Sequence, residues 1–596
     1  MASVKAGQVV TIGPRNKGYA GVAGPATPRI RLSPPDSISC RPTAPVEAPL
    51  ENRTRIAKAA GIIMLGNIIS RLLGLAREQV IAALFGAKLA TDVWTVASTV
   101  PTMVYDLLIS GAISAALIPV FSDYAEAKDR EELSRIVSSV LSIFTAALAV
   151  VVGILLLGAP LLVDILGGGF KEQARELTTY LVRLILPSVL FTGTAGILTA
   201  ALYARQSFTL PAFSVAVYNI GIILGGVLLA GRLEVTSLAV GVLIGAFLQV
   251  AIQIPGLQGV RLRPALNLSH PGVRVILRLY APVALGLVVS NIGVIIDRNL
   301  ASGTGEGSLA AMRFATTLVQ FPLGLVATAA SFAVLPTLSR QATAEARDAV
   351  SHKLASISTQ HSASSTQNPE PSTQHSSYAS TLRMGMKMIL LLIVPAAVGL
   401  AVLREPVIQL LFQRGAFTQD ATALTSLAFL GYSPGIAFAA VDQLLIFAFY
   451  ARKDTRTPVL VGVMAIFVYL AVALSLVGSM GMMGLVLANA VQTISHAVVL
   501  MWLLNRVVKG ALNSEMIGFL ARIVGAAVAM GFACEMLLSV AAPHASSGPR
   551  VALLVAVSAA LGAVVYIAGI TILRVREARD LWSLLASRLP RRLRPT

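Results

Sequence analysis

The chain of 596 residues has few charges and almost no cysteine. Asp, Glu, Lys and Arg make up 13% of it, against about 25% in an average soluble domain. The two cysteines, Cys40 and Cys534, stand in unlike contexts, which argues against a disulfide framework and a cysteine-based metal site. Hydrophobic residues make up 56%, and the mean hydropathy is +0.77. This composition predicts a protein that crosses a membrane many times.

The sequence also lacks the motifs of common ATPases, metalloproteases and hydrolases. It contains no G-x-x-x-x-G-K-[ST], no H-E-x-x-H and no G-x-S-x-G. No aspartate-rich cluster resembles a magnesium–diphosphate site, because the acidic run at 129–132 is typical of a solvated loop. We therefore expect a transporter rather than an enzyme, with no cofactor and no bound metal.

The formal net charge of +19 has two explanations. It could attract nucleic acid, but in a membrane protein Lys and Arg collect in cytoplasmic loops. The basic residues fall mainly in alternate loops and in the terminal segments if both termini lie inside. We predict a multi-pass protein with both termini cytoplasmic, in contact with membrane lipids and not with nucleic acid. The oligomeric state is not readable, and a monomer is one option.

About fourteen apolar segments are long enough to span a bilayer, which makes the fold class all-α and polytopic. They cover residues 57–84, 90–121, 136–165, 174–204, 209–231, 236–258, 273–303, 307–338, 381–403, 419–450, 457–479, 481–505, 516–540 and 550–573. We divide them into a first lobe of six helices, a second lobe of six helices and a final pair. These units cover residues 55–260, 261–510 and 511–575.

Three polar segments lie outside the spans. Residues 1–54 predict a disordered basic cytoplasmic tail, with a start codon upstream of the true one as the alternative. The 343–380 segment repeats Ser-Thr-Gln-His-Ser and predicts a flexible cytoplasmic loop. Residues 576–596 mix arginines with leucines and predict a basic amphipathic tail at the membrane surface.

Charges inside the first span are the strongest functional signal. Arg71 and Glu78 share one helical stripe, and Ser70 and Arg77 share the neighbouring stripe. A charge in the bilayer costs several kcal/mol unless it faces a polar cavity. The planar guanidinium donates two parallel hydrogen bonds, which suits a diphosphate. The alternative is that Arg77 reaches the far interface or pairs with Glu78.

Three further charged positions have open roles. Asp92 either caps the helix that it opens or forms a gating pair with an arginine. Asp297 and Arg298 form an interfacial pair, or Asp297 binds a cation or a proton. Arg313 faces either the far interface or the cavity.

The chain resembles the MurJ (MviN) family of lipid II flippases, over about residues 56–510. The motifs that carry the resemblance are Ser70-Arg71-x-x-Gly74-x-x-Arg77-Glu78, Phe85-Gly86-Ala87, Ala90-Thr91-Asp92, Gly111-Ala112-x-Ser114-x-Ala116-x-Ile118-Pro119, Ile296-Asp297-Arg298, Phe321-Pro322-x-Gly324, Leu335-Pro336-x-Leu338-Ser339-Arg340, Phe412-Gln413-Arg414-Gly415-x-Phe417-Thr418 and Phe449-Tyr450-Ala451-Arg452-Lys453-Asp454-x-Arg456-Thr457-Pro458.

The resemblance implies the fold of the multidrug/oligosaccharidyl-lipid/polysaccharide exporter superfamily. That fold has two six-helix lobes in a V and two added helices that line a groove for a polyprenyl tail. A cationic central cavity would receive the diphosphate–sugar head group of lipid II, and alternating access would carry it across the bacterial cell membrane for peptidoglycan synthesis. Export of another lipid-linked saccharide or amphipathic solute is the alternative. The energy source, membrane potential or an ion gradient, is not readable.

By the same resemblance, Arg71 and Arg77 match cavity arginines, and Ser70 and Asp92 match functional polar positions. Three positions depart from the family. Tyr105 stands in place of an arginine, Ser110 in place of a glutamate, and Thr317 in place of a second arginine. Arg313 precedes Thr317 by four residues and hence lies on the same helix face. We therefore hypothesise that Arg313 supplies the missing positive charge.

Overall fold

A computed structural model describes residues 50–106, 116–126, 130–258, 260, 262–267, 269–327, 334–335, 337–344, 347, 373–508, 510, 513–541 and 548–578. The chain divides into two units, Met1–Ile56 and Ala57–Thr596. The described part of the first unit is helical, so residues 50–54 begin a helix and are not part of a disordered tail. The rest of that predicted tail, most of the 343–380 loop and most of the 576–596 tail lie outside the described residues.

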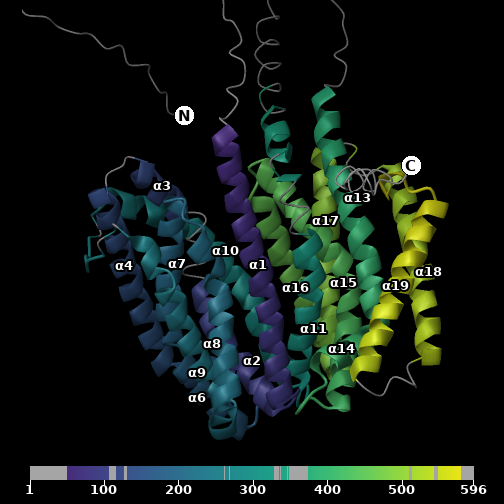
Figure 1. The fold of residues 1–596 in the computed structure, drawn as a ribbon, viewed down its shortest axis with the longest axis horizontal. Coiled ribbons are helices and arrows are strands. Elements are labelled where there is room, and N and C mark those ends of the chain that lie inside the picture. Colours follow the sequence, from purple (N-terminus) through teal and green to yellow (C-terminus); the bar gives the residue numbers. More distant parts are fainter. Residues whose placement is uncertain are drawn as a thin grey trace, which may run out of the picture. The chain divides into compact units, whose positions relative to one another are not determined.

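Every regular element in these described residues is helical, as the sequence predicts (Figure 1). The first half of the chain forms α1 (Leu50–Phe85), α2 (Leu89–Tyr105), α3 (Ile118–Glu126), α4 (Arg130–Leu157), α5 (Ala159–Leu166), α6 (Glu172–Ile185), α7 (Ser188–Ala204), α8 (Thr209–Leu233), α9 (Thr236–Ala251) and a short 3₁₀ helix (Ile254–Leu257). In this group α2 packs on α6, α7 packs on α4 and α9, and α8 packs on α9.

The second half forms a comparable set of long helices. They are α10 (Pro271–Ser302), α11 (Ser308–Pro322), a π-helical turn (Leu323–Ala327), α13 (Thr373–Val402), α14 (Arg404–Phe412), α15 (Gln419–Ala451), α16 (Arg456–Met480), α17 (Met482–Val507), α18 (Ser514–Ala541) and α19 (Gly548–Ile572). Here α15 packs on α11, α13 and α17, and α16 packs on α17. The division into lobes at residue 260 stays a prediction.

Glycines let α8 and α9 approach closely. Gly221 and Gly225 on α8 are one turn apart, and so are Gly241 and Gly245 on α9. A Cβ atom on Gly221 would collide with Gly245, and one on Gly225 would collide with Gly241. Small residues spaced in this way allow backbone contact between helices in a membrane, where packing rather than water exclusion drives association.

The last two helices attach to α13. Lys387 on α13 is 7% exposed and binds two carboxylates, Glu515 at 2.9 Å and Glu577 at 2.5 Å. The Tyr566 hydroxyl on α19 donates to the Leu391 carbonyl on α13 at 2.9 Å. These contacts hold the start of α18 and the end of α19 against α13.

Ten helical segments in the described residues are long and apolar enough to span a membrane. They correspond to all the predicted spans except 57–84, 90–121, 273–303 and 307–338. These four contain α1, α2, α10 and α11, and they carry the intramembrane charges Arg77, Glu78, Asp92, Asp297 and Arg313. The ten also include charged residues, such as Lys387 on α13 and Asp442 on α15. The total of fourteen spans stays a prediction.

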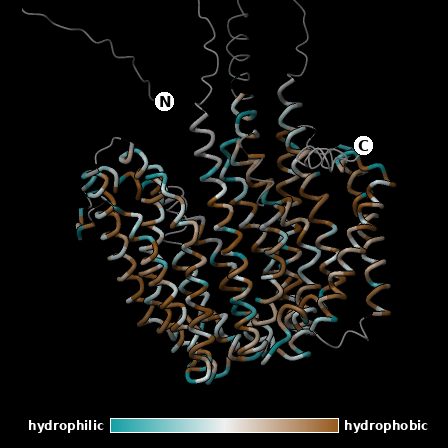
Figure 2. The backbone as a smooth tube through the Cα atoms, viewed as in Figure 1, coloured by the Kyte–Doolittle hydropathy of each residue, from teal (hydrophilic) through white to brown (hydrophobic). Residues whose placement is uncertain are grey.

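Large apolar side chains cover the outside of these helices. Hydrophobic residues run along the helices, while hydrophilic residues gather near many helix ends (Figure 2). In α4, for example, only 22% of the most apolar window is buried inside the protein. Such surface is stable in hydrocarbon and not in water, which agrees with a multi-pass membrane protein.

Candidate functional site

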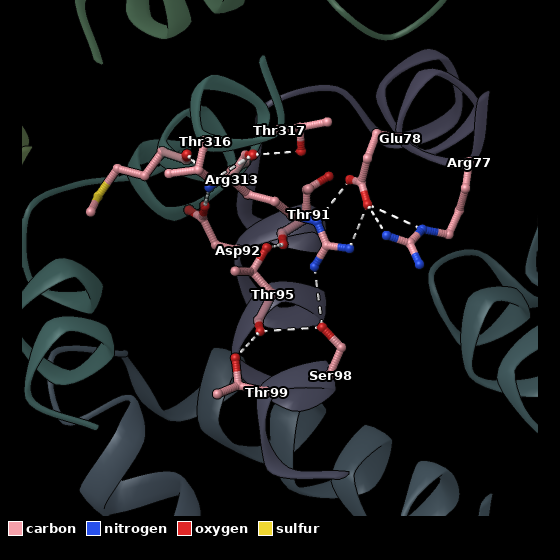
Figure 3. A network of polar contacts seen from close by, with 12 residues as sticks. Arg77, Glu78, Thr91, Asp92, Thr95, Ser98, Thr99, Arg313, Thr316 and Thr317 are labelled. Atoms are coloured by element: carbon pink, nitrogen blue, oxygen red, sulfur yellow. Dashed lines mark hydrogen bonds and ion pairs between the residues drawn. The ribbon is translucent and has the colours of Figure 1, made fainter. Parts of the chain in front are cut away.

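The charged parts of α1 and α11 meet at one buried carboxylate. Glu78 is 2% exposed and accepts hydrogen bonds from two arginines (Figure 3). Arg77 donates to Glu78 Oε1 from Nη2 at 2.7 Å and from Nε at 3.1 Å. Arg313 donates from Nε to Oε2 at 2.8 Å and from Nη2 to Oε1 at 2.9 Å. A carboxylate buried to this degree stays charged because both guanidiniums neutralise and hydrogen-bond it.

Two polar side chains orient these arginines from other helices. Asn219 on α8 accepts a hydrogen bond from Arg77 Nη1 at 3.0 Å and donates to the Ser70 carbonyl at 3.2 Å. Ser98 on α2 accepts from Arg313 Nη1 at 3.2 Å. Ser70, predicted as a substrate-binding residue, therefore joins the network through its backbone. Four helices, α1, α2, α8 and α11, hold the arginines in place.

A cavity of 640 Å³ opens beside the network. Among the described residues that line it are three cationic groups, Arg71, Arg77 and Arg313, against the single carboxylate of Glu78. Among the described residues Arg71 has no carboxylate partner, and its side chain is exposed. A Cβ atom at Gly324 would collide with the Arg71 guanidinium, so the glycine leaves room for this side chain. The cavity is therefore an anion-attracting site with one unpaired guanidinium.

Arg313 lies where the sequence hypothesis places it. It shares the cavity lining with Thr317, whose hydroxyl donates to the Arg313 carbonyl at 3.0 Å. Both residues thus face the same space from one side of α11. Arg313 brings a guanidinium to a cavity in which Thr317 has none, although Glu78 neutralises part of its charge.

Asp92 takes a role that neither sequence alternative named. Its carboxylate, 2% exposed, accepts hydrogen bonds from the backbone amides of Gly307 at 2.6 Å and Ala310 at 2.7 Å. It therefore caps α11 and not α2, the helix on which it lies (Figure 3). Within the described part of the chain, Asp92 forms no ion pair with an arginine. The predicted cap of its own helix was wrong, because a cap can come from a helix far away in sequence. A gating role for Asp92 stays a prediction.

The cap is reciprocal. Glu306, immediately before the Gly307 turn, accepts a hydrogen bond from the backbone amide of Leu89 at the start of α2 at 3.2 Å. The start of α11 is thus bound by a carboxylate of α2, and the start of α2 by a carboxylate in the turn before α11. Gly307 has φ +82°, and a Cβ atom there would collide with the Ala87 carbonyl. The two chain segments consequently approach each other closely at this end of α2 and α11.

Asp297 lies in a second cavity of 520 Å³ that α10, α15, α16 and α17 line. It accepts a hydrogen bond from the Tyr469 hydroxyl at 2.8 Å, and Arg298 Nη1 lies 3.7 Å away. The same cavity contains the pair His496–Asp442, with Nδ1 and Oδ1 2.7 Å apart. No cluster of three or more His, Cys, Asp or Glu side chains in the described residues could hold a metal ion. The arginine–aspartate pair is thus present, and a role for Asp297 in ion binding stays a prediction.

Sequence reasoning missed two residues that position the arginines. Asn219 is an amide in the middle of an otherwise apolar run, and that isolation is a signal that could have identified it. Ser98 gives no such signal, because hydroxyls often bond to their own helix. The predicted departure Ser110 lies outside the described residues.

The comparisons with known proteins concern the family and the fold of the chain. A family model described as "Lipid II flippase MurJ" matches residues 81–556. The chain is 29% identical to a probable lipid II flippase MurJ of Vibrio cholerae over 424 residues, which is 69% of this chain and 75% of that protein. It is also 29% identical to a probable lipid II flippase MurJ of Haemophilus influenzae over 484 residues, 78% of this chain and 89% of that protein.

Two solved structures share the fold. A lipid II flippase MurJ in an inward closed conformation matches with a TM-score of 0.70 at 22% identity, covering 87% of this chain and 99% of that one. An inward-facing multidrug resistance MATE transporter of the MOP superfamily matches with a TM-score of 0.57 at 13% identity, covering 76% and 95%. At these identities the likeness concerns the fold alone.

Proposed function

The chain belongs to the MurJ family, and we propose that it flips lipid II from the cytoplasmic to the outer leaflet of the bacterial cell membrane. In this proposal both termini are cytoplasmic, and alternating access of two six-helix lobes carries the head group. The lipid tail stays in the bilayer, against α18 and α19. The chain acts as a transporter in peptidoglycan synthesis and catalyses no covalent reaction.

The observation that supports this function is the excess of guanidinium groups on one cavity. A diphosphate needs several donors held at fixed angles, and arginine supplies a rigid fork of them. Arg71 and Arg77 come from the first half of the chain and Arg313 from the second. A diphosphate bound between them would contact both halves at once, which couples head-group binding to the arrangement of the lobes.

Glu78 gives this site a way to change state. Its fork with Arg313 joins α1 to α11 across the cavity. An incoming diphosphate would compete with Glu78 for the same N–H groups, because both are anions that prefer bidentate guanidinium contacts. We propose that head-group binding loosens the Glu78–Arg313 bridge, and that release restores it. The resting bridge thus keeps the buried arginines neutralised when no substrate is present.

A second proposal concerns the energy source. Asp297 lies in the separate 520 Å³ cavity and is the candidate for an ion that resets the transporter. Moving one charge through 100 mV provides about 2.3 kcal/mol, enough to bias such a step. An Asp297→Asn variant that transports with an unchanged dependence on sodium, protons and membrane potential would contradict this role.

The decisive experiment is genetic rescue with a biochemical readout. The chain is expressed in cells depleted of their own lipid II flippase, and lipid II exposed on the outer leaflet is measured directly. We expect growth and outward lipid II to recover, and both to be lost in an Arg71→Ala variant. Arg232→Ala is the matched control, since Arg232 is exposed near the end of α8 and outside the cavity.

The alternative substrate has its own observation. Tyr105 and Thr317 stand where the family resemblance leads us to expect arginines, so fewer cations are present for a diphosphate. An exporter of another lipid-linked saccharide would insert in the membrane normally, fail to rescue the depleted cells and export that solute. This combination of results would reject lipid II as the substrate while retaining the transport class.

A further inference from the structure

A second polar pocket lies within the first half of the chain, among α2, α7, α8 and α9. Its volume is 280 Å³, at the lower limit of typical small-molecule sites. The polar groups that line it include two phenols, a carboxylate, an amide and two hydroxyls. They belong to Tyr105, Tyr218, Asp106, Gln249, Ser188 and Thr192. No guanidinium or ammonium group is among the described residues that line the pocket, so their charge is opposite in sign to that of the arginine cavity.

The hydrogen-bonding capacity of this pocket is largely unused. The Gln249 Oε1 atom is buried and has no hydrogen-bond partner. In the ranges that the structure covers, the Asp106 carboxylate and the Tyr218 hydroxyl also make no hydrogen bond, and both residues are partly exposed. A buried polar atom without a partner, as Gln249 Oε1 is, costs about 1–3 kcal/mol, so proteins rarely keep one without a reason. A ligand rich in hydroxyl or amide groups would satisfy all three.

The pocket adjoins the arginine network along two helices. On α2, Ser98 binds Arg313, and Tyr105 follows two turns later. At 1.5 Å per residue this places the pocket roughly 10 Å from the arginine site along the helix axis. On α8, Tyr218 immediately precedes Asn219, which binds Arg77. The pocket is therefore close enough to the arginines for a head group with its phosphates there to reach it.

We propose that this pocket is a subsite for one sugar ring of the transported head group. Asp106 and Gln249 would accept hydrogen bonds from its hydroxyl or amide groups, while Tyr105 and Tyr218 would pack against its faces. The inference rests on the proposed function, in which a diphosphate occupies the arginine cavity. A phosphate would not enter, because Asp106 repels it. A polyprenyl tail would not enter, because it would leave these polar groups without partners.

The proposed subsite gives a physical reason for tyrosine at position 105. An arginine at position 105 would place a cation beside Asp106 and neutralise it. Tyrosine instead leaves the carboxylate available and adds an amphipathic ring, which is apolar on its face and polar at its tip. The departure from the family pattern thus exchanges a phosphate contact for a saccharide contact within the same helix turn.

The test compares two probes on the purified full-length chain. One probe is a polyprenyl diphosphate that carries an N-acetylated disaccharide, and the other is the bare polyprenyl diphosphate. We measure the Kd of each for the wild type and for Asp106→Ala, Asp106→Asn, Gln249→Leu and Tyr105→Ala. Asp123→Ala is the control, since Asp123 is exposed on α3 and outside the pocket. Thermal unfolding of each variant reports whether it is folded.

We expect the wild type to bind the saccharide probe about tenfold more tightly than the bare probe. Asp106→Ala, Gln249→Leu and Tyr105→Ala should each reduce this preference to less than threefold, and Asp106→Asn should keep part of it by hydrogen bonding. Because the readout is a ratio of two probes on one protein sample, loss of some folded protein does not change it.

Three results would overturn the subsite. The preference could survive Asp106→Ala and Gln249→Leu together. Asp106→Asn could reduce the preference as much as Asp106→Ala does, which would identify a cationic ligand instead of a sugar. The wild type could bind both probes equally, which rejects the subsite while a diphosphate site remains. Failure of both probes to bind the wild type, or equal binding by Arg71→Ala, would reject the proposed function itself.

Discussion

Glu78 and Asp92 are two carboxylates of equal burial, each 2% exposed, with very different partners. Glu78 binds the side chains of Arg77 and Arg313 at the edge of a cavity. Asp92 binds backbone amides at the start of α11. A guanidinium can exchange one anion for another, whereas a backbone amide cannot leave its helix. Burial alone therefore does not distinguish a carboxylate that a substrate could displace from one that stabilises the fold. The distinction depends on whether the partners of the carboxylate are side chains or backbone amides.

The largest predicted effect concerns Asp92. Asp92→Ala leaves the Gly307 and Ala310 amides buried without an acceptor, and we expect it to destabilise the protein by about 3 kcal/mol. Thermal unfolding of the purified variant measures this loss. Glu306→Ala removes the opposite and more exposed cap and should cost about 0.5–1 kcal/mol. Equal shifts for both variants would contradict the distinction between a buried and an exposed cap.

Arg313→Ala removes one of the two arginines that bind Glu78. We expect a tenfold or greater loss of lipid II transport, because the cavity loses one of three cations and Glu78 loses its fork with α11. Outer-leaflet lipid II in depleted cells is the readout, with Arg232→Ala as the control for surface charge. Normal transport by Arg313→Ala, beside a complete loss in Arg71→Ala, would reject the idea that Arg313 replaces the missing arginine.

Glu78→Gln should have a smaller effect, which strengthens substrate binding and slows transport. The amide keeps some hydrogen bonds to the arginines but no longer competes as an anion for them. We therefore expect the polyprenyl diphosphate probe to bind about threefold more tightly and transport to slow by a similar factor. Binding and transport assays on the same preparation separate the two changes. Weaker binding in this variant would show that Glu78 orients the arginines and does not compete with the substrate.

The smallest effect is expected at Asp454, a carboxylate in the loop before α16. Partial burial raises its pKa, but hydrogen bonds from the Thr457 hydroxyl and amide and from the Arg456 amide hold the pKa below its usual value of 3.8. A carboxyl whose pKa is lower in the folded protein stabilises the fold at pH values above its pKa in the unfolded chain. This contribution disappears as the pH falls through its pKa in the folded protein.

Asp454→Asn should therefore cost at most about 1 kcal/mol at pH 7 and close to nothing at pH 2.5. The unfolding temperatures of both proteins at the two pH values provide the measurement. A difference between wild type and variant that grows at low pH would have the wrong sign for this cap. The result sets a baseline for carboxylates that bind backbone amides at the surface.

Sequence reasoning succeeded where a residue type is costly in its surroundings. Arg71, Arg77 and Glu78 stand out because charges in an apolar span require a polar cavity. Arg313 was found by helical periodicity, which places residues four apart on one face. The same logic would have reached Asn219. It could not reach Ser98 or Gln249, since hydroxyls often bond to their own helix and an amide near a helix end has many local partners.

Asp92 shows where such reasoning stops. Its position in the first turn of a helix is compatible with an ordinary cap, and its charge is compatible with a gate. Only the arrangement of α2 against α11 reveals that it binds amides more than two hundred residues away. The cap of α2 by Glu306 could not be predicted from the sequence either, because no local pattern around Asp92 or Glu306 indicates which helix it binds.

The sequence by itself determined the helical membrane fold, the family and the stretch of α1 that carries the cavity arginines. Composition, span length and costly charges are properties of single segments, and they are readable before any contact forms. The tertiary structure alone decided which charges meet, which carboxylate binds side chains and which binds backbone amides, and which polar groups remain unpaired beside the arginines. Those outcomes depend on distances between helices far apart in the chain, and local propensity carries no information about them.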